Sequence, residues 1–134
     1  MIDELRSDLI LVVEDVRETS DGIERLLKAD GYRVALAGDE RDAIESAKLR
    51  RPDLILMSWT GLLDEILASV RRIRAAVGDQ IPVVFWVEDI DEGEEVAVGG
   101  NVHLMRPDSF NQLRGLLARL LDESSRCRDN VATE

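Results

Sequence analysis

Residues 9–15 read LILVVED, a run of five apolar residues that stops at two acids. A run without alternation between apolar and polar residues is typical of a strand that is buried on both faces of a sheet. Further runs of this kind follow along the chain at 32–36 (YRVAL), 53–57 (DLILM), 82–87 (PVVFWV) and 102–105 (VHLM). The sequence therefore predicts five short, buried strands.

Helical patterns separate these runs. Ile23, Leu26 and Leu27 mark a first helix, which Gly31 can end as a left-handed residue, and Asp39 can cap a second helix. The third helix is predicted from apolar residues at three-and-four spacing, namely Leu63, Ile66, Leu67, Val70 and Ile73.

The last third of the chain carries a weak pattern followed by a strong one. The segment after Val87 is rich in carboxylates and glycine, and it leaves room for only a short fourth helix around residues 92–98. Ser109 and Gln112 form a capping-box motif ahead of a leucine-rich pattern, which predicts a long last helix. We expect one domain over residues 1–122 and a polar, disordered tail over residues 123–134.

Five alternations of strand and helix predict an α/β fold, a three-layer, doubly wound parallel sheet with helices on both faces. Functional residues in such sheets lie beyond the carboxyl ends of the strands. The residues at those ends are Glu14, Asp15, Ser58, Val87, Glu88, Arg106 and Pro107.

Composition limits the classes of partner. The 134 residues carry a net charge of -11, which disfavours the binding of nucleic acid by this domain and of anionic membranes. The first residues, MIDELRSD, lack the apolar stretch of a secretion signal, and a single cysteine, Cys127, cannot form an internal disulfide. We expect a cytoplasmic protein.

The strand ends resemble those of receiver domains of two-component response regulators. The resemblance covers roughly residues 8–121 and rests on LILVVED, PDLIL, IPVV and the RP that precedes the last helix. It implies a flavodoxin-like sheet of order 2-1-3-4-5. In that family a histidine kinase passes a phosphoryl group to an aspartate after the third strand, an acidic pair holds Mg²⁺, and a hydroxyl residue and a lysine bind the phosphoryl oxygens.

This chain keeps only part of that set. Glu14 and Asp15 match the acidic pair, but Ser58 stands at the phosphoacceptor position. Val87 and Arg106 stand at the hydroxyl and lysine positions, and His103 stands where the family has an aromatic switch residue.

These departures predict a degenerate receiver. A serine hydroxyl is a weak nucleophile without an activating base, and two carboxylates hold Mg²⁺ less well than three, so any binding of this ion is expected to be weak. We expect an ion pair between Arg106 and Asp15 to fill the former metal site.

The predicted function is a receiver-like signalling module, not an enzyme, which acts by protein contact without ordinary aspartyl phosphorylation. Its partner would be a histidine kinase or an output protein, and the chain itself a monomer or a weak homodimer. The surface of the fourth helix, fifth strand and last helix is the first candidate for that contact. Exposed tryptophans at Trp59 or Trp86, or the acidic run over residues 88–95, would also suit a partner.

Two alternatives stay open. The first is a receiver that is switched by modification of Ser58 or by residual Mg²⁺ binding. The second, from another class, is a small flavodoxin-like nucleotide-binding or enzyme domain. No glycine-rich phosphate loop follows the first strand, which disfavours this second alternative.

Overall fold

The computed structural model describes residues 8–58, 63–78, 80–87, 90–99, 101–106 and 109–132, without the side chains of residues 63, 99 and 124–132. Within these residues the strands form one six-stranded sheet of order β2-β1-β3-β4-β6-β5. The strands are β1 (Leu9–Val13), β2 (Arg33–Ala37), β3 (Leu54–Ser58), β4 (Val83–Trp86), β5 (Glu95–Gly99) and β6 (Val102–Met105).

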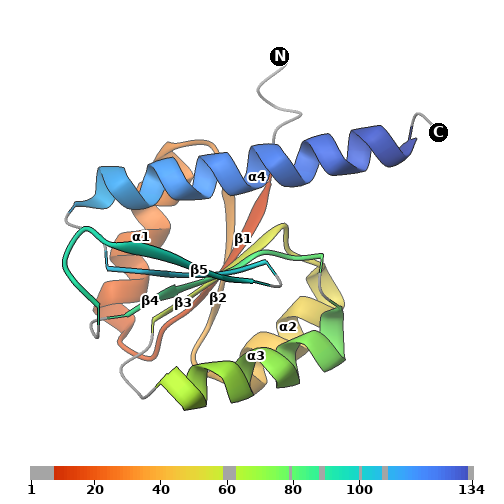
Figure 1. Ribbon diagram of the computed structural model, residues 1–134. Coiled ribbons are helices and arrows are strands. Elements are labelled where there is room, and N and C mark those ends of the chain that lie inside the picture. The colour runs from red at the N-terminus through yellow and green to blue at the C-terminus, as the bar shows by residue number, and fades with distance from the viewer. Residues whose placement is uncertain are drawn as a thin grey trace.

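Helices cover both faces of the sheet (Figure 1). Helices α1 (Arg17–Ala29) and α4 (Phe110–Ala132) lie on one face, and α2 (Glu40–Arg50) and α3 (Leu63–Val77) lie on the other. The predicted three-layer α/β architecture is confirmed, and the five parallel strands have the expected order. None of the described helices combines the length and the apolar character that a membrane span needs.

Continuous apolar runs arise because both faces of the sheet are covered. Leu11 and Val13 of β1 point into the core under α2 and α3, whereas Ile10 and Val12 point into the core under α1 and α4. All five residues of β1 are buried, and Leu11 lies between Ala35 of β2 and Ile55 of β3 in a parallel register. Alternating side chains thus fill two cores from one strand.

The predicted helix ends are confirmed at two positions. The Asp39 side chain accepts a hydrogen bond from the Asp42 N–H at 2.8 Å and caps α2. Gly31 follows α1 with φ 97°, a conformation that glycine adopts without a steric penalty. Leu26, which the pattern assigned to the buried face of α1, is 46% exposed.

The prediction of a short fourth helix is wrong. Residues 95–99 form β5, which pairs with β6 in an antiparallel register and ends the sheet. The sequence EVAVG favours this outcome because it is short, carries two β-branched valines and is bounded by glycines at 93 and 99. The surface that we expected around a fourth helix therefore consists of a strand edge beside α4.

The last helix is longer than predicted. We expected residues 123–134 to be disordered, but α4 continues to Ala132. Leu121 is the last buried residue among the side chains of α4 that the structure describes, which end at Glu123. No glycine or proline interrupts residues 122–132, and a helix nucleated on the core can propagate through such a segment.

Candidate functional site

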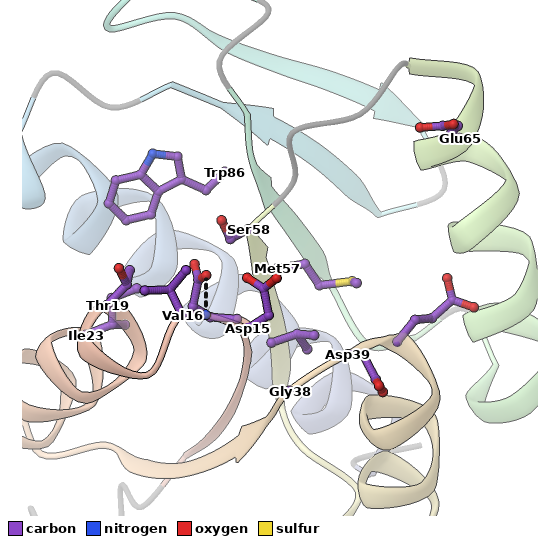
Figure 2. Close-up of a pocket in the computed structure, with 13 residues that line it drawn as sticks. Asp15, Val16, Thr19, Ile23, Gly38, Asp39, Met57, Ser58, Glu65 and Trp86 are labelled. Atoms are coloured by element: carbon purple, nitrogen blue, oxygen red, sulfur yellow. Dashed lines mark hydrogen bonds between the residues drawn. The ribbon is translucent and has the colours of Figure 1, made fainter.

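The carboxyl ends of β1 and β3 border a pocket with a volume of about 730 Å³. Glu14, Asp15 and Ser58 all line it, so the structure brings these three predicted site residues together. In Figure 2, Ser58 lies beside Asp15, with Trp86 on one side and Asp39 and Glu65 on the other. Parallel strands produce this arrangement because their carboxyl ends meet at one edge of the sheet.

The acidic pair is held by the end of β1. The Glu14 N–H donates to the Ala37 carbonyl of β2 at 3.0 Å, which continues the strand pairing beyond Val13. The Glu14 carboxylate then folds back and accepts from the Val16 N–H at 3.0 Å, the contact dashed in Figure 2. Asp15 is exposed. One oxygen of the Glu14 carboxylate is thus engaged in a hydrogen bond with the chain's own backbone.

Ser58 is the last residue of β3 and is exposed at the edge of the sheet. It lies opposite Trp86 of β4 in the parallel register. Among the described residues, no hydrogen bond joins its hydroxyl to Glu14 or Asp15, the carboxylates of this pocket that could act as a base.

Further carboxylates extend the acidic border of the pocket. Asp39 and Glu40 at the start of α2 and Glu65 on α3 line it too, and no described lining residue is a lysine or arginine. Glu40 accepts hydrogen bonds from the buried Ser69 hydroxyl at 2.7 Å and from Arg72 Nη2 at 2.8 Å. The hydrogen bond from Arg72 holds the pKa of Glu40 below its usual value.

The residues present do not fit a protein-held Mg²⁺ ion. Mg²⁺ requires octahedral oxygen ligands, and it is held by carboxylates together with waters and phosphates. In the part of the chain that the structure describes, no three carboxylate, histidine or cysteine side chains converge closely enough to hold a metal. Ser58 leaves the end of β3 without a carboxylate beside Glu14 and Asp15.

Val87 does not face the pocket. It is 3% exposed and packs in the core under α2 and α3, and its N–H donates to the Met105 carbonyl at 2.9 Å. An apolar side chain is favoured there because a hydroxyl would be buried in the same surroundings. No phosphoryl-binding hydroxyl is therefore available from this position.

Arg106 is directed away from the acidic pair. Its Nη1 donates to the Ile90 carbonyl at 3.1 Å, and its backbone N–H donates to the Glu94 carbonyl at 3.1 Å. The expected ion pair with Asp15 is wrong, because no such pair forms between these two described residues. Ile90 belongs to the short connection from β4 to β5, and its carbonyl accepts this one hydrogen bond from the guanidinium.

His103 lies on β6 between Val84 of β4 and Ala97 of β5. Its Nδ1 is buried and has no hydrogen-bond partner among the described residues. Burial lowers the pKa of His103, Glu95 and Glu123 act in the opposite direction, and Arg119 adds to the lowering.

The sequence pointed to part of this site. Glu14, Asp15 and Ser58 were predicted because they stand at the ends of buried strands. Asp39 was interpreted only as a helix cap, and Glu40 and Glu65 were missed. Their signal was their position at the first turn of a helix that follows a strand. Trp59, Glu88 and Pro107 lie outside the described residues, whereas Trp86 is half-buried and lines the pocket.

Curated relatives of the chain are response regulators. Response regulator MprA of Mycobacterium ulcerans (strain Agy99) is 31% identical over 130 residues, which cover 92% of this chain and 56% of that protein. MprA of Mycolicibacterium vanbaalenii is 30% identical over 115 residues, which cover 84% and 49%. The chain thus spans about half the length of these relatives. No protein-family model matches it.

Solved receiver structures share the fold. The receiver domain of the sensor histidine kinase PA1611 from Pseudomonas aeruginosa PAO1 is 28% identical, with a TM-score of 0.65 over 87% of this chain and 98% of that one. That structure has a magnesium ion coordinated in its active-site cleft. Vibrio cholerae chemotaxis protein CheY4 is 20% identical, with a TM-score of 0.65 over 85% and 98%, a likeness in fold alone. Sequence relatives and structural neighbours together support a receiver domain of the response-regulator kind.

Proposed function

We propose that this chain is a receiver-type signalling module that acts by binding a partner protein, without ordinary aspartyl phosphorylation. The observation that carries the proposal is Ser58 at the carboxyl end of β3, in one pocket with Glu14 and Asp15. A receiver would carry its phosphoacceptor carboxylate at this position. A serine hydroxyl that is hydrogen-bonded to no base among the described residues is a poor substitute, because it is neither charged nor strongly nucleophilic.

The other phosphoryl-binding positions support the same proposal. Val87 is buried without a hydroxyl, and the Arg106 guanidinium bonds the Ile90 carbonyl instead of facing the pocket. An incoming phosphoryl group would meet carboxylates and no cation among the described lining residues. Electrostatic repulsion opposes its binding there. The same repulsion disfavours a nucleotide-binding or flavodoxin-like enzyme.

The partner in this proposal is a protein of a two-component pathway in the cytoplasm, either a histidine kinase or an output protein. Any Mg²⁺ binding would be weak, because one oxygen of the Glu14 carboxylate already accepts a hydrogen bond from the Val16 N–H. A second candidate function is a receiver switched by modification of Ser58. The exposure of this hydroxyl at the sheet edge favours that candidate.

The test is an amide NMR titration with Mg²⁺, followed by beryllofluoride, a mimic of the aspartyl phosphate. We expect no large saturable shifts around residues 14, 58 and 106. Large shifts that saturate at these residues would show that the phosphorylation switch is retained and would overturn the proposal.

A substitution sharpens this test. Ser58→Asp adds a third carboxylate beside Glu14 and Asp15, so we expect it to raise Mg²⁺ affinity by on the order of tenfold, or about 1.4 kcal/mol. Ser109→Asp makes the same chemical change at an exposed position near the start of α4 and serves as the matched control. An unchanged Mg²⁺ affinity in Ser58→Asp would contradict the geometry assigned to the site.

A further inference from the structure

The pocket at the carboxyl ends of β1 and β3 combines an apolar part with an acidic part. Ile23 of α1 and Met57 of β3 line it with buried side chains. Val16, which is 50% exposed, and the half-buried Trp86 line the same pocket (Figure 2). Its volume of about 730 Å³ lies within the range of small-molecule sites. The pocket therefore suits a ligand that has an apolar stem and a polar end.

Carboxylates dominate the polar lining of the pocket. Five of them line it, namely Glu14, Asp15, Asp39, Glu40 and Glu65. Glu40 is paired with Arg72 of α3. Among the described residues, no ion pair involves Glu14, Asp15 or Asp39. A cation that enters the pocket would therefore meet carboxylates that no ion pair within this part of the chain occupies.

The described residues supply no cation to this pocket. Arg106, at the end of β6, donates to the Ile90 carbonyl instead. The sequence also has no lysine or arginine at 59–62, directly after Ser58, or at 88–89. Several carboxylates that face one partly desolvated cavity attract a cation more strongly than they would in bulk water. A positively charged ligand is therefore favoured, and an anionic one is repelled.

We propose that the pocket receives an arginine side chain of the partner protein, an inference that rests on the partner-binding function proposed above. The apolar stem of arginine matches Ile23 and Met57, and its planar guanidinium donates paired hydrogen bonds to a carboxylate such as that of Asp15. The Trp86 indole offers a ring on which a guanidinium stacks. Lysine matches less well, because its ammonium is more strongly hydrated and lacks the planar fork.

An amide NMR titration of the whole chain with N-acetylarginine amide tests the proposal. We expect saturable shifts at the amides of Gly38 and Ser58 and at the indole N–H of Trp86. N-acetylcitrulline amide is the neutral isostere, and its dissociation constant should be at least about tenfold higher. N-acetyllysine amide, acetylated only at its α-amino group, should bind about threefold more weakly than arginine. Added salt should weaken the binding of arginine.

Two outcomes of this titration would overturn the proposal. The first is an absence of saturable shifts at these three positions with the arginine compound. The second is citrulline that binds as tightly as arginine, which would mean that charge does not drive the binding. Lysine that binds as tightly as arginine would contradict the preference for the guanidinium.

Asp15→Asn tests the acidic part of the pocket at an exposed position, where a substitution does not disturb the core. The loss of one carboxylate should raise the dissociation constant for N-acetylarginine amide at least about threefold. Asp91→Asn makes the same change at an exposed residue that does not line the pocket and should leave it unchanged. Equal affinities in the two variants would contradict the site.

A pair of variants at Trp86 tests the stacking contact. Trp86→Leu removes the aromatic ring and should raise the dissociation constant for N-acetylarginine amide about threefold, whereas Trp86→Phe keeps a ring and should stay within about twofold of wild type. A Trp86→Leu protein that binds like wild type would contradict the stacking.

The beryllofluoride titration separates this inference from the function on which it rests. A protein that responds neither to N-acetylarginine amide nor to beryllofluoride overturns the arginine site and leaves the partner-binding function standing. A saturable response to beryllofluoride overturns that function, whatever the arginine compound does.

Discussion

The strand-end residues differ in exposure and contacts between the two halves of the sheet's carboxyl edge. Beside β1 and β3, Glu14, Asp15 and Ser58 border an open pocket. Beside β4 and β6, Val87 is buried in the core and Arg106 bonds the Ile90 carbonyl. One half keeps polar groups accessible, and the other uses its corresponding positions for packing and for fixing the β4–β5 connection. Accessible polar groups and packed side chains thus occupy separate halves of one sheet edge.

Among the tests of this comparison, Phe85→Ala in β4 has the largest expected effect. Phe85 is fully buried in the core that β1 and β3 also fill, so its loss should lower the free energy of unfolding by about 3–5 kcal/mol. Urea denaturation followed by circular dichroism measures this. Leu49→Ala, at an 85% exposed position, should change stability by less than about 0.5 kcal/mol. Two separate transitions would mean that the halves do not share one cooperative core.

Val87→Thr tests the closed half directly. The new hydroxyl would be buried without a partner, so we expect a loss of about 1–3 kcal/mol in the free energy of unfolding. We expect no gain in the response to beryllofluoride. Val98→Thr makes the same change at a 40% exposed position and should be nearly neutral. A Val87→Thr protein of unchanged stability that responds to beryllofluoride would show that this half still faces the pocket.

The smallest expected effect concerns His103 and pH. Burial lowers the pKa of His103 in the folded protein below its usual value of 6.5, so the unfolded chain takes up the proton first. The resulting stability is fully present above pH 6.5 and is lost as the pH falls towards the folded-state pKa. Glu95, Arg119 and Glu123 face this imidazole and modify the shift.

Denaturation of wild type and His103→Leu at a series of pH values measures this contribution. The variant should lack the loss of stability that begins just below pH 6.5 and should keep the loss from carboxylates such as Glu40, whose lowered pKa acts below pH 4.5. Parallel curves for the two proteins would mean that burial does not lower the pKa of His103 in the folded protein.

Local patterns predicted most of the fold. The strand at 9–13 and the strand at 102–105 have the predicted bounds, and the Asp39 cap and the left-handed Gly31 are where the pattern indicated. These features depend on short-range steric and hydrogen-bonding preferences. Residues 92–98 were misassigned because a segment of that length has no decisive period, and the available edge of β6 favoured a strand.

The sequence by itself determined the five parallel strands and the meeting of Glu14, Asp15 and Ser58 at one edge, because buried runs specify strands and parallel strands share an edge. Only the tertiary structure decided where Arg106 points and that the sheet continues into β5. A guanidinium bonds whichever acceptors the folded chain brings within reach, and an edge strand forms where a neighbouring strand offers unpaired backbone groups. Both outcomes depend on residues distant in sequence, which no local pattern records.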